Sequence, residues 1–369
     1  MRICFIGDCG SVHVERWVRW FAGTYDVGVI STGIGNRIPE YTIGRLPTRS
    51  KPFSRVLESA LEVRRLITRY RPDVVHCHYI NEAGWLGAIT AFHPLIISAW
   101  GSDLYRAPKE SRLAHTLNPW ALRRADWITC DSHDQARVIH SWKVNPARVS
   151  VIGWGIDRAE FHPGLDGTSS RDAYGIPLDA PVLLSPRQWL ANSNIPTIIA
   201  AHARLADDVY LILKHSPGAG ACTDENAVVT RHIAGSPARN RIVEIGELPE
   251  RELPSLYAAA DAVVSLCSTD GTPVSVLEAM AVGQPVVALD IPSLSEWVRE
   301  PGGRLVSSLD PASVAAAVEP FLVDPAARAR AAQANVEIVA QRADRSSEFA
   351  RMAAIYRQAA NSDQARHGD

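Results

Sequence analysis

Short apolar segments alternate with amphipathic segments along the chain. In the first half, five apolar segments predict buried strands, at residues 2–7, 27–31, 73–78, 95–99 and 127–130. Between them, residues 13–22 and 54–70 show the spacing of apolar side chains that is typical of helices. Strands that are apolar on both faces and alternate with helices indicate a parallel sheet. We expect His76 and His78 to face opposite sides of their strand, one of them in the core.

The alternation pauses once, near the middle of the chain. Residues 157–181 hold Gly, Pro, Ser and Asp with little periodicity, which indicates a linker. Five further apolar segments follow, at residues 182–185, 209–213, 242–245, 262–266 and 286–289. We therefore predict an α/β protein with one domain over 1–165 and a second over 175–345. Residues 346–369 are expected to form a helix that packs back and ends in a frayed tail.

The composition excludes several classes of protein. The 369 residues are 46% apolar, and the formal net charge of −2 argues against nucleic acid as a partner. Charged residues interrupt every apolar run well short of the ~18 residues of a spanning helix. The N-terminal apolar run is too short for a secretory signal. Six cysteines without a CxxC pair predict reduced thiols in a cytoplasmic protein, with no zinc site or disulfide framework.

Motifs of other enzyme classes do not occur in the chain. The sequence has no GxxxxGK[ST], which disfavours a P-loop nucleotide hydrolase, and no Gly-x-Ser-x-Gly, which disfavours an α/β-hydrolase. Asp-x-Asp, the metal–diphosphate clamp of another large class of sugar transferases, is also absent. We therefore expect neither a metal ion nor another cofactor.

Residues 268–297 carry the most informative pattern. After the strand that ends near residue 266, a polar turn, a capping residue and a helix-starting proline follow as Asp270-Gly271-Thr272-Pro273. We expect Thr272 to be the helix N-cap and Gly283 to end the helix. Such a helix begins at the carboxyl edge of a parallel sheet, where its N–H groups and dipole favour an anion such as a diphosphate. Glu278 lies inside this helix among apolar neighbours, which favours a buried carboxylate.

This segment resembles the donor-site signature of the retaining glycosyltransferases of family four, the glycosyl transferases group 1. Their pattern is Glu, seven residues, Glu, then Ala-Met-Ala-x-Gly-x-Pro-Val-Val-Ala. Here Asp270 takes the first acidic position, Glu278 follows after seven residues, and residues 279–288 complete the match. The family's other motifs have counterparts at residues 73–78, 155–163 and 246–262. The resemblance implies a GT-B fold, with two Rossmann-like domains facing a central cleft.

The resemblance implies that the second domain holds a nucleoside-diphosphate sugar. Glu278 is expected to bind the ribose hydroxyls. Asp270, as a catalytic residue, and the backbone of Gly271, Thr272 and Pro273 are expected to hold the transferred sugar. The base is expected to be uracil, because UDP is the family's commonest carrier.

Arg187, which follows the strand at 182–185, is expected to be catalytic and to clamp the departing diphosphate. The family's second cation, a lysine between Gln188 and Ile195, is missing here. Lys214, at the end of the next strand, is the candidate substitute. An equally good interpretation is that Lys214 is a solvated strand-end charge.

The first domain is expected to hold the acceptor. Gly10 and Ser11 replace the family's glycine-rich loop and are expected to approach the leaving phosphate of the donor. His13, Trp100 and Ser102 are expected to bind the acceptor, although Trp100 stands where the family often has histidine. Asp103 is a catalytic candidate that would orient the acceptor hydroxyl. Capping roles for His13 and Asp103 are equally open interpretations.

The resemblance as a whole implies a hexosyltransferase-type enzyme. It would transfer a sugar from a nucleotide sugar to the hydroxyl of a glycan, a glycolipid or a small natural product, with retention and without a metal. The alternatives are a nucleotide-sugar epimerase or a phosphorylase on the same fold, or a non-catalytic sugar-binding protein. A phosphorylase would need a pyridoxal-binding lysine, and Lys214, the only lysine of the second half, has no supporting motif.

Residues 45–71 carry a local excess of positive charge. Eight Arg and Lys residues stand there against Glu58 and Glu62. One interpretation is peripheral contact with anionic lipid at the inner membrane face. The interpretation we favour is a solvated helix surface in an arginine-rich protein.

Overall fold

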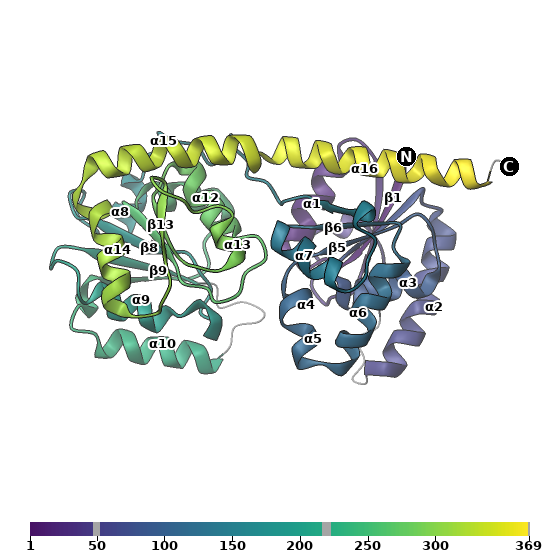
Figure 1. Ribbon diagram of the computed structural model, residues 1–369, viewed down its shortest axis with the longest axis horizontal. Helices are drawn as coiled ribbons and strands as arrows, with labels where there is room; N and C mark the ends of the chain where they lie inside the picture. Colours follow the sequence, from purple (N-terminus) through teal and green to yellow (C-terminus); the bar gives the residue numbers. More distant parts are fainter. Residues whose placement is uncertain (47–51, 216–222, 368–369) are drawn as a thin grey trace. The chain divides into compact units, whose positions relative to one another are not determined.

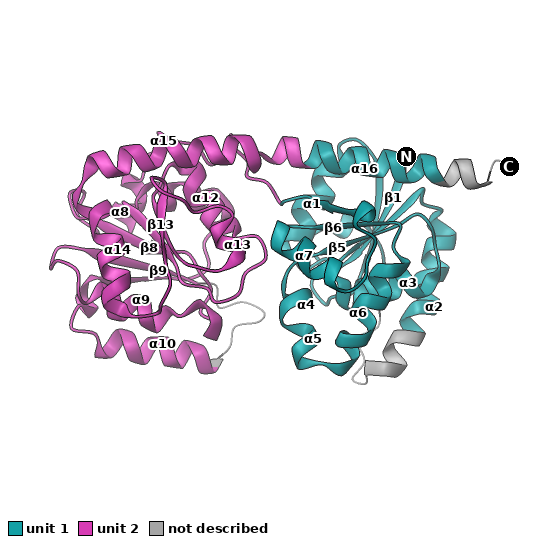
Figure 2. Cartoon of the chain, viewed as in Figure 1, with its two compact units in different colours: residues 1–153, 349–369 teal, residues 154–348 magenta. Residues whose placement is uncertain are grey.

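The chain forms two compact units. The computed structural model describes the backbone of residues 1–46, 52–215 and 223–367, and the side chains of 1–46, 58–215 and 224–362. One unit holds residues 1–153 and 349–369, and the other holds residues 154–348 (Figure 2). The boundary thus lies before the expected linker, and residues 157–181 belong to the second unit.

The first unit is built on a seven-stranded parallel sheet of order β3-β2-β1-β4-β5-β6-β7. Figure 1 labels β1, β5 and β6 of this sheet. The strands are β1 (Arg2–Gly7), β2 (Asp26–Ser31), β3 (Thr42–Arg45), β4 (Val74–His78), β5 (Leu95–Ala99), β6 (Trp127–Cys130) and β7 (Val149–Val151). The order reverses between β1 and β4, which register as Ile3 opposite Val74. Ligands of open α/β sheets bind at the carboxyl ends of strands at such a reversal.

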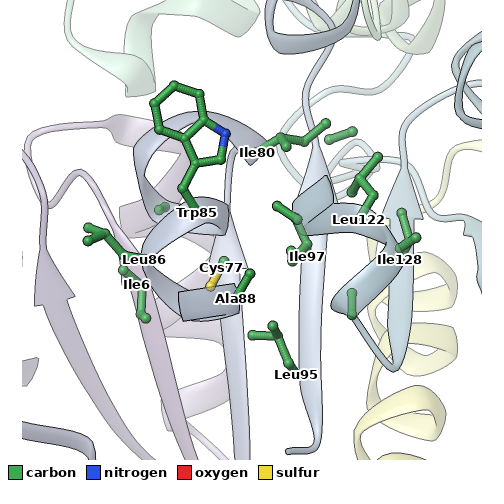
Figure 3. Close-up of a cluster of buried hydrophobic side chains, with 14 of the residues drawn as sticks. Ile6, Cys77, Ile80, Trp85, Leu86, Ala88, Leu95, Ile97, Leu122 and Ile128 are labelled. Carbon is green, nitrogen blue, oxygen red and sulfur yellow. The ribbon is translucent and has the colours of Figure 1, made fainter. Parts of the chain in front are cut away.

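Helices cover both faces of this sheet. They are α1 (Val12–Ala22), α2 (Pro52–Tyr70), α3 (Trp85–Thr90), α4 (Ser102–Tyr105), α5 (Ala107–Glu110), α6 (Arg112–Arg124), α7 (His133–Ser141) and most of α16 (Arg345–His367). On one face, α3 and α6 pack Trp85, Leu86 and Leu122 against strand residues such as Cys77 and Ile97 (Figure 3).

The opposite face carries the C-terminal helix. Trp17 of α1 and Tyr356 of α16 pack there against Phe5 and His76, and the Tyr356 hydroxyl lies 2.6 Å from Nδ1 of His76. His78 lies on this same face, with its ring centroid 4.5 Å from that of His76. The expectation of opposite faces was wrong, because residues two apart in a strand point to the same side.

The second unit repeats this architecture around six parallel strands of order β10-β9-β8-β11-β12-β13. The strands are β8 (Val182–Ser185), β9 (Tyr210–Lys214), β10 (Ile242–Ile245), β11 (Ala262–Ser265), β12 (Val286–Leu289) and β13 (Gly303–Val306). The helices are α8 (Thr168–Ala173), α9 (Ile195–His202), α10 (Thr223–Gly235), α11 (Leu253–Ala258), α12 (Val274–Val282), α13 (Pro292–Ser295), α14 (Pro311–Val323) and α15 (Pro325–Arg342).

Alternate side chains of each strand in this unit serve two cores. Val182 and Leu184 of β8 face a core that α11 and α12 complete, whereas Leu183 faces a core that α9 and α14 complete. The order reverses between β8 and β11, where Val263 registers with Leu184. The second unit therefore has its own candidate binding edge, at the carboxyl ends of β8 and β11.

The predicted strands are confirmed to within a residue or two, but β3, β7 and β13 were not predicted. These three strands have only three or four residues each. Helix α16 continues to His367, so the helix covers most of the tail that was expected to be frayed from residue 361. Every helix in the described ranges is too short or too polar to cross a bilayer.

Candidate active site

Arg187 and Asp270 meet at the carboxyl edge of the second sheet. Arg187 lies two residues beyond β8, and Asp270 lies in the turn beyond β11. Nη1 of Arg187 is 3.0 Å from Oδ2 of Asp270 and donates a hydrogen bond of 3.1 Å to Oγ of Ser275, in the first turn of α12. Burial is the largest single influence and opposes the charge on Arg187, but the carboxylate of Asp270, together with Cys267 and Tyr257, raises the pKa of the guanidinium. The predicted cation is thus held at the start of α12.

The helix α12 begins one residue later than expected. Its N-cap is Pro273, and no side chain caps it in the described structure, so the prediction of Thr272 as the cap was wrong. Thr272 instead accepts the Val274 N–H with its carbonyl. Gly283 ends the helix with φ of 94°, as its position predicts. The first turn of α12 therefore places the positive end of a helix dipole beside Arg187, while its Val274 and Val276 N–H groups donate to the carbonyls of Thr272 and Pro273.

Asparagines occupy the loop where the family's second lysine is missing. Nδ2 of Asn192 donates to the carbonyl and hydroxyl of Thr269, and Nδ2 of Asn194 donates to the carbonyl of Leu266. The loop after β8 is thereby fastened to the loop that carries Asp270. The amide groups of these asparagines hold the two loops together, but they do not replace the positive charge of the missing lysine.

Glu278 and Lys214 lie at the same edge. Glu278 is only 6% exposed, and its Oε2 accepts a hydrogen bond of 3.0 Å from the hydroxyl of Tyr257 on α11. Burial lowers the pKa of Lys214, and the nearby carboxylates of Glu278 and Glu247 act in the opposite direction. Lys214 is therefore close to the charges of the site and is only partly exposed, which disfavours the interpretation as a fully solvated charge.

At the edge of the first sheet, Gly10 and Ser11 form the entry to α1. Ser11 is the N-cap of α1, and the Gly10 N–H donates to Oδ1 of Asp8. A Cβ on Gly35 would lie 2.8 Å from Cα of Gly10, so the two glycines allow the loops after β1 and β2 to approach closely. The backbone at this edge is compact, and the approach of Gly10 and Ser11 to a leaving phosphate stays a prediction.

The predicted acceptor residues gather at the carboxyl ends of β1, β4 and β5. The ring of Trp100 lies 6.2 Å from His13, 5.4 Å from His78 and 6.1 Å from Tyr79, centroid to centroid. Burial, with a smaller contribution from Arg16, lowers the pKa of His13 to about 4, so that this ring is neutral at pH 7. The Tyr79 hydroxyl lies 2.5 Å from Oγ of Ser102.

Asp103 has a different setting from the one expected. It has no exposed surface, and its oxygens accept the N–H groups of Ile80, Trp100 and Gly101. Burial raises the pKa of Asp103 to about 6, against the effect of these backbone bonds. In this conformation the carboxylate of Asp103 caps backbone N–H groups and is too deeply buried to contact an acceptor. The geometry therefore favours the capping interpretation over the catalytic one.

Sequence reasoning did not assign a role to Ser275, Asn192, Tyr257 or Tyr79. Tyr257 was noted only as part of a family motif, and Tyr79 follows a strand end that was recognised. The positive φ of 85° at Tyr79 could not be predicted from the sequence, because tyrosine is not one of the residue types that favour this backbone conformation. Among the described side chains, no group of three or more His, Cys, Asp or Glu could hold a metal ion.

The chain thus has two doubly wound units, each with polar loops at its own strand reversal. The family model described as glycosyl transferase 4-like matches residues 2–132, and that of the glycosyl transferases group 1 matches residues 166–337. The chain belongs to this glycosyltransferase family and has the GT-B fold.

One similar protein is the D-inositol 3-phosphate glycosyltransferase of Mycolicibacterium gilvum. It is 28% identical over 277 residues, which are 70% of this chain and 61% of that relative. The match thus spans less than two thirds of the relative's length.

Two solved structures share the fold. Sucrose-phosphate synthase from Thermosynechococcus elongatus aligns with a TM-score of 0.83 at 19% identity, over 97% of this chain and 98% of that one. Anabaena Alr3699/HepE in complex with UDP-glucose aligns with a TM-score of 0.83 at 19% identity, over 97% of this chain and all of that one.

Proposed function

We propose that the chain transfers a sugar from a nucleoside-diphosphate sugar to an acceptor hydroxyl, with retention of the anomeric configuration and without a metal ion. One observation carries the proposal: Arg187 and Asp270 pair at the start of α12, beyond β8 and β11, and the same helix carries the buried carboxylate of Glu278. A cation, a helix N-terminus and buried carboxylates match the diphosphate, sugar and ribose of such a donor.

UDP is the proposed carrier. The support is the family's preference and the Anabaena relative, whose structures hold UDP-glucose and UDP. Those proteins share only the fold with this chain, so the base is part of the proposal. The acceptor would be a hydroxyl of a glycan, a glycolipid or a small natural product.

The proposal of metal independence rests on protein groups that would supply the positive charge a metal ion otherwise provides. Arg187 and the first turn of α12 would stabilise the departing diphosphate, with Lys214 as the second cation. The protein would mainly position the reactants, and the leaving phosphate would take the acceptor proton. No described side chain is needed as a separate base in this scheme.

Slow hydrolysis of the donor tests the proposal without an identified acceptor. UDP-glucose and related nucleotide sugars are incubated with the protein in excess EDTA, and proton NMR follows the free sugar. The α-anomer appearing first from an α-linked donor is the expected result. Release of the β-anomer first would contradict retention of configuration. Activity only with added Mg²⁺ or Mn²⁺ would contradict metal independence, and no release from any UDP, GDP or ADP sugar would contradict the transferase proposal.

A peripheral membrane location stays a prediction. Arg64, Arg65 and Arg69 are exposed on α2, beside Leu61, which is 72% exposed. Arg49 and Lys51 lie outside the described residues, as does the side chain of Arg55. Flotation with anionic liposomes at physiological salt separates the interpretations: co-flotation supports a lipid-linked acceptor, and its absence supports a solvated surface.

A further inference from the structure

The carboxylate of Glu278 is buried and hydrogen-bonded. With 6% of its surface exposed, Glu278 needs polar partners, because an ionised carboxylate without them is costly to bury. The hydroxyl of Tyr257 supplies one, at 3.0 Å from Oε2. A carboxylate oxygen can accept more than one hydrogen bond, so this contact orients the group without using up its capacity.

Tyr257 is itself held rigidly. Its side chain is 2% exposed, and its ring packs edge-on against Phe161, with centroids 6.0 Å apart and planes at 66°. Phe161 is 3% exposed and comes from the segment that leads into the second unit. Tyr257 also lies near enough to Arg187 to contribute to the electrostatic environment of that guanidinium. The phenol thus lies near both principal charges of the candidate donor site.

We propose that Tyr257 is a positioning residue, which aims the Glu278 carboxylate at the ribose of the donor and so sets the preference for ribonucleotides over deoxynucleotides. The inference rests on the proposed function. A misaimed carboxylate would keep its charge but lose its geometry toward the two hydroxyls, so the effect of Tyr257 should be confined to ligands that carry them. A merely structural role would weaken all ligands alike.

The test compares Tyr257→Phe with the wild type. Isothermal titration uses whichever of UDP, GDP or ADP the wild type binds, and the matching 2′,3′-dideoxynucleoside diphosphate. We expect Tyr257→Phe to lose about 5- to 10-fold of the affinity for the ribonucleotide, the size of one ordinary net hydrogen bond, because the carboxylate itself remains. The dideoxy analogue should bind both proteins equally. Tyr210→Phe, at the far end of β9, is the matched control and should change neither affinity.

Each outcome decides a separate question. If the wild type binds none of the three nucleotides, the proposed function fails, and this inference fails with it. If the wild type binds and Tyr257→Phe matches it, or weakens both ligands equally, only the inference is overturned. If Tyr257→Phe does not fold, Phe161→Leu keeps the hydroxyl but loosens the ring, and should reduce the ribose preference in the same direction by a smaller factor. An unchanged preference in Phe161→Leu would then overturn the inference.

Discussion

Replacing Arg187 by alanine removes the main cation of the candidate donor site. The guanidinium lies 3.0 Å from Asp270 and 3.1 Å from Ser275, and the two charged side chains are 20% and 10% exposed. A charge-assisted hydrogen bond in such a setting contributes about 1.5–3 kcal/mol, so UDP affinity should fall by about 10- to 150-fold. Turnover should fall by two orders of magnitude or more, since loss of one preorganised electrostatic donor costs ~3–4 kcal/mol.

Binding of uridine distinguishes loss of the phosphate contact of Arg187 from a general disturbance of the site. Because uridine has no phosphate, its affinity should be the same in Arg187→Ala and in the wild type, when both are titrated by calorimetry. Arg241→Ala is a matched control. Its side chain is 22% exposed and pairs with Asp207 at 3.2 Å, at the opposite edge of the same sheet. Equal losses for uridine and UDP in Arg187→Ala, or unchanged UDP binding, would refute the reasoning.

Four further changes test other parts of the account. Glu278→Gln should weaken nucleoside diphosphate binding by ~1.5–3 kcal/mol in calorimetry, and unchanged affinity would remove its ribose role. Lys214→Ala should lower donor hydrolysis by less than Arg187→Ala does, and near-normal turnover would leave Arg187 as the one cation of the clamp among the described residues. Gly283→Ala should lower the free energy of unfolding by ~1–2 kcal/mol in urea titrations, because φ is 94° and a Cβ would lie 3.2 Å from that of Ala332. Burial lowers the pKa of His78 from 6.5 to about 3. Below pH 6.5 the unfolded chain therefore takes up a proton at this residue that the folded chain does not, and the free energy of unfolding should fall by up to ~1.4 kcal/mol per pH unit. The slope should be smaller in His78→Phe.

Strong local patterns made the fold and the donor edge predictable. Nearly all of the ten predicted strands are apolar runs with mostly buried residues, β10 at the sheet edge being the exception, and the turn at Asp270 is followed by a proline and a helix that Gly283 ends. The cap was misassigned because Thr272 and Pro273 are adjacent and both suit a helix start. Strands β3, β7 and β13 were missed because polar residues or glycine interrupt their three or four residues, whereas equally short strands such as β8 and β12 are almost continuous apolar runs.

Contacts between distant positions could not be predicted from one sequence. The hydrogen bond of Tyr257 to Glu278 spans 21 positions, and that of Asn192 to Thr269 spans 77. The role of Asp103 could not be predicted from the sequence either. Its position after a strand suits catalysis as well as capping, and only the three backbone N–H groups around its carboxylate decide between them.

A crystal structure of the chain with bound UDP tests the central claim most directly. We predict the diphosphate at Arg187 and the first turn of α12, and the ribose hydroxyls on the carboxylate of Glu278, with the Tyr257 hydroxyl still hydrogen-bonded to Oε2. Nucleotide bound at the edge of the first sheet, or at the second edge with its diphosphate away from both Arg187 and α12, would contradict it.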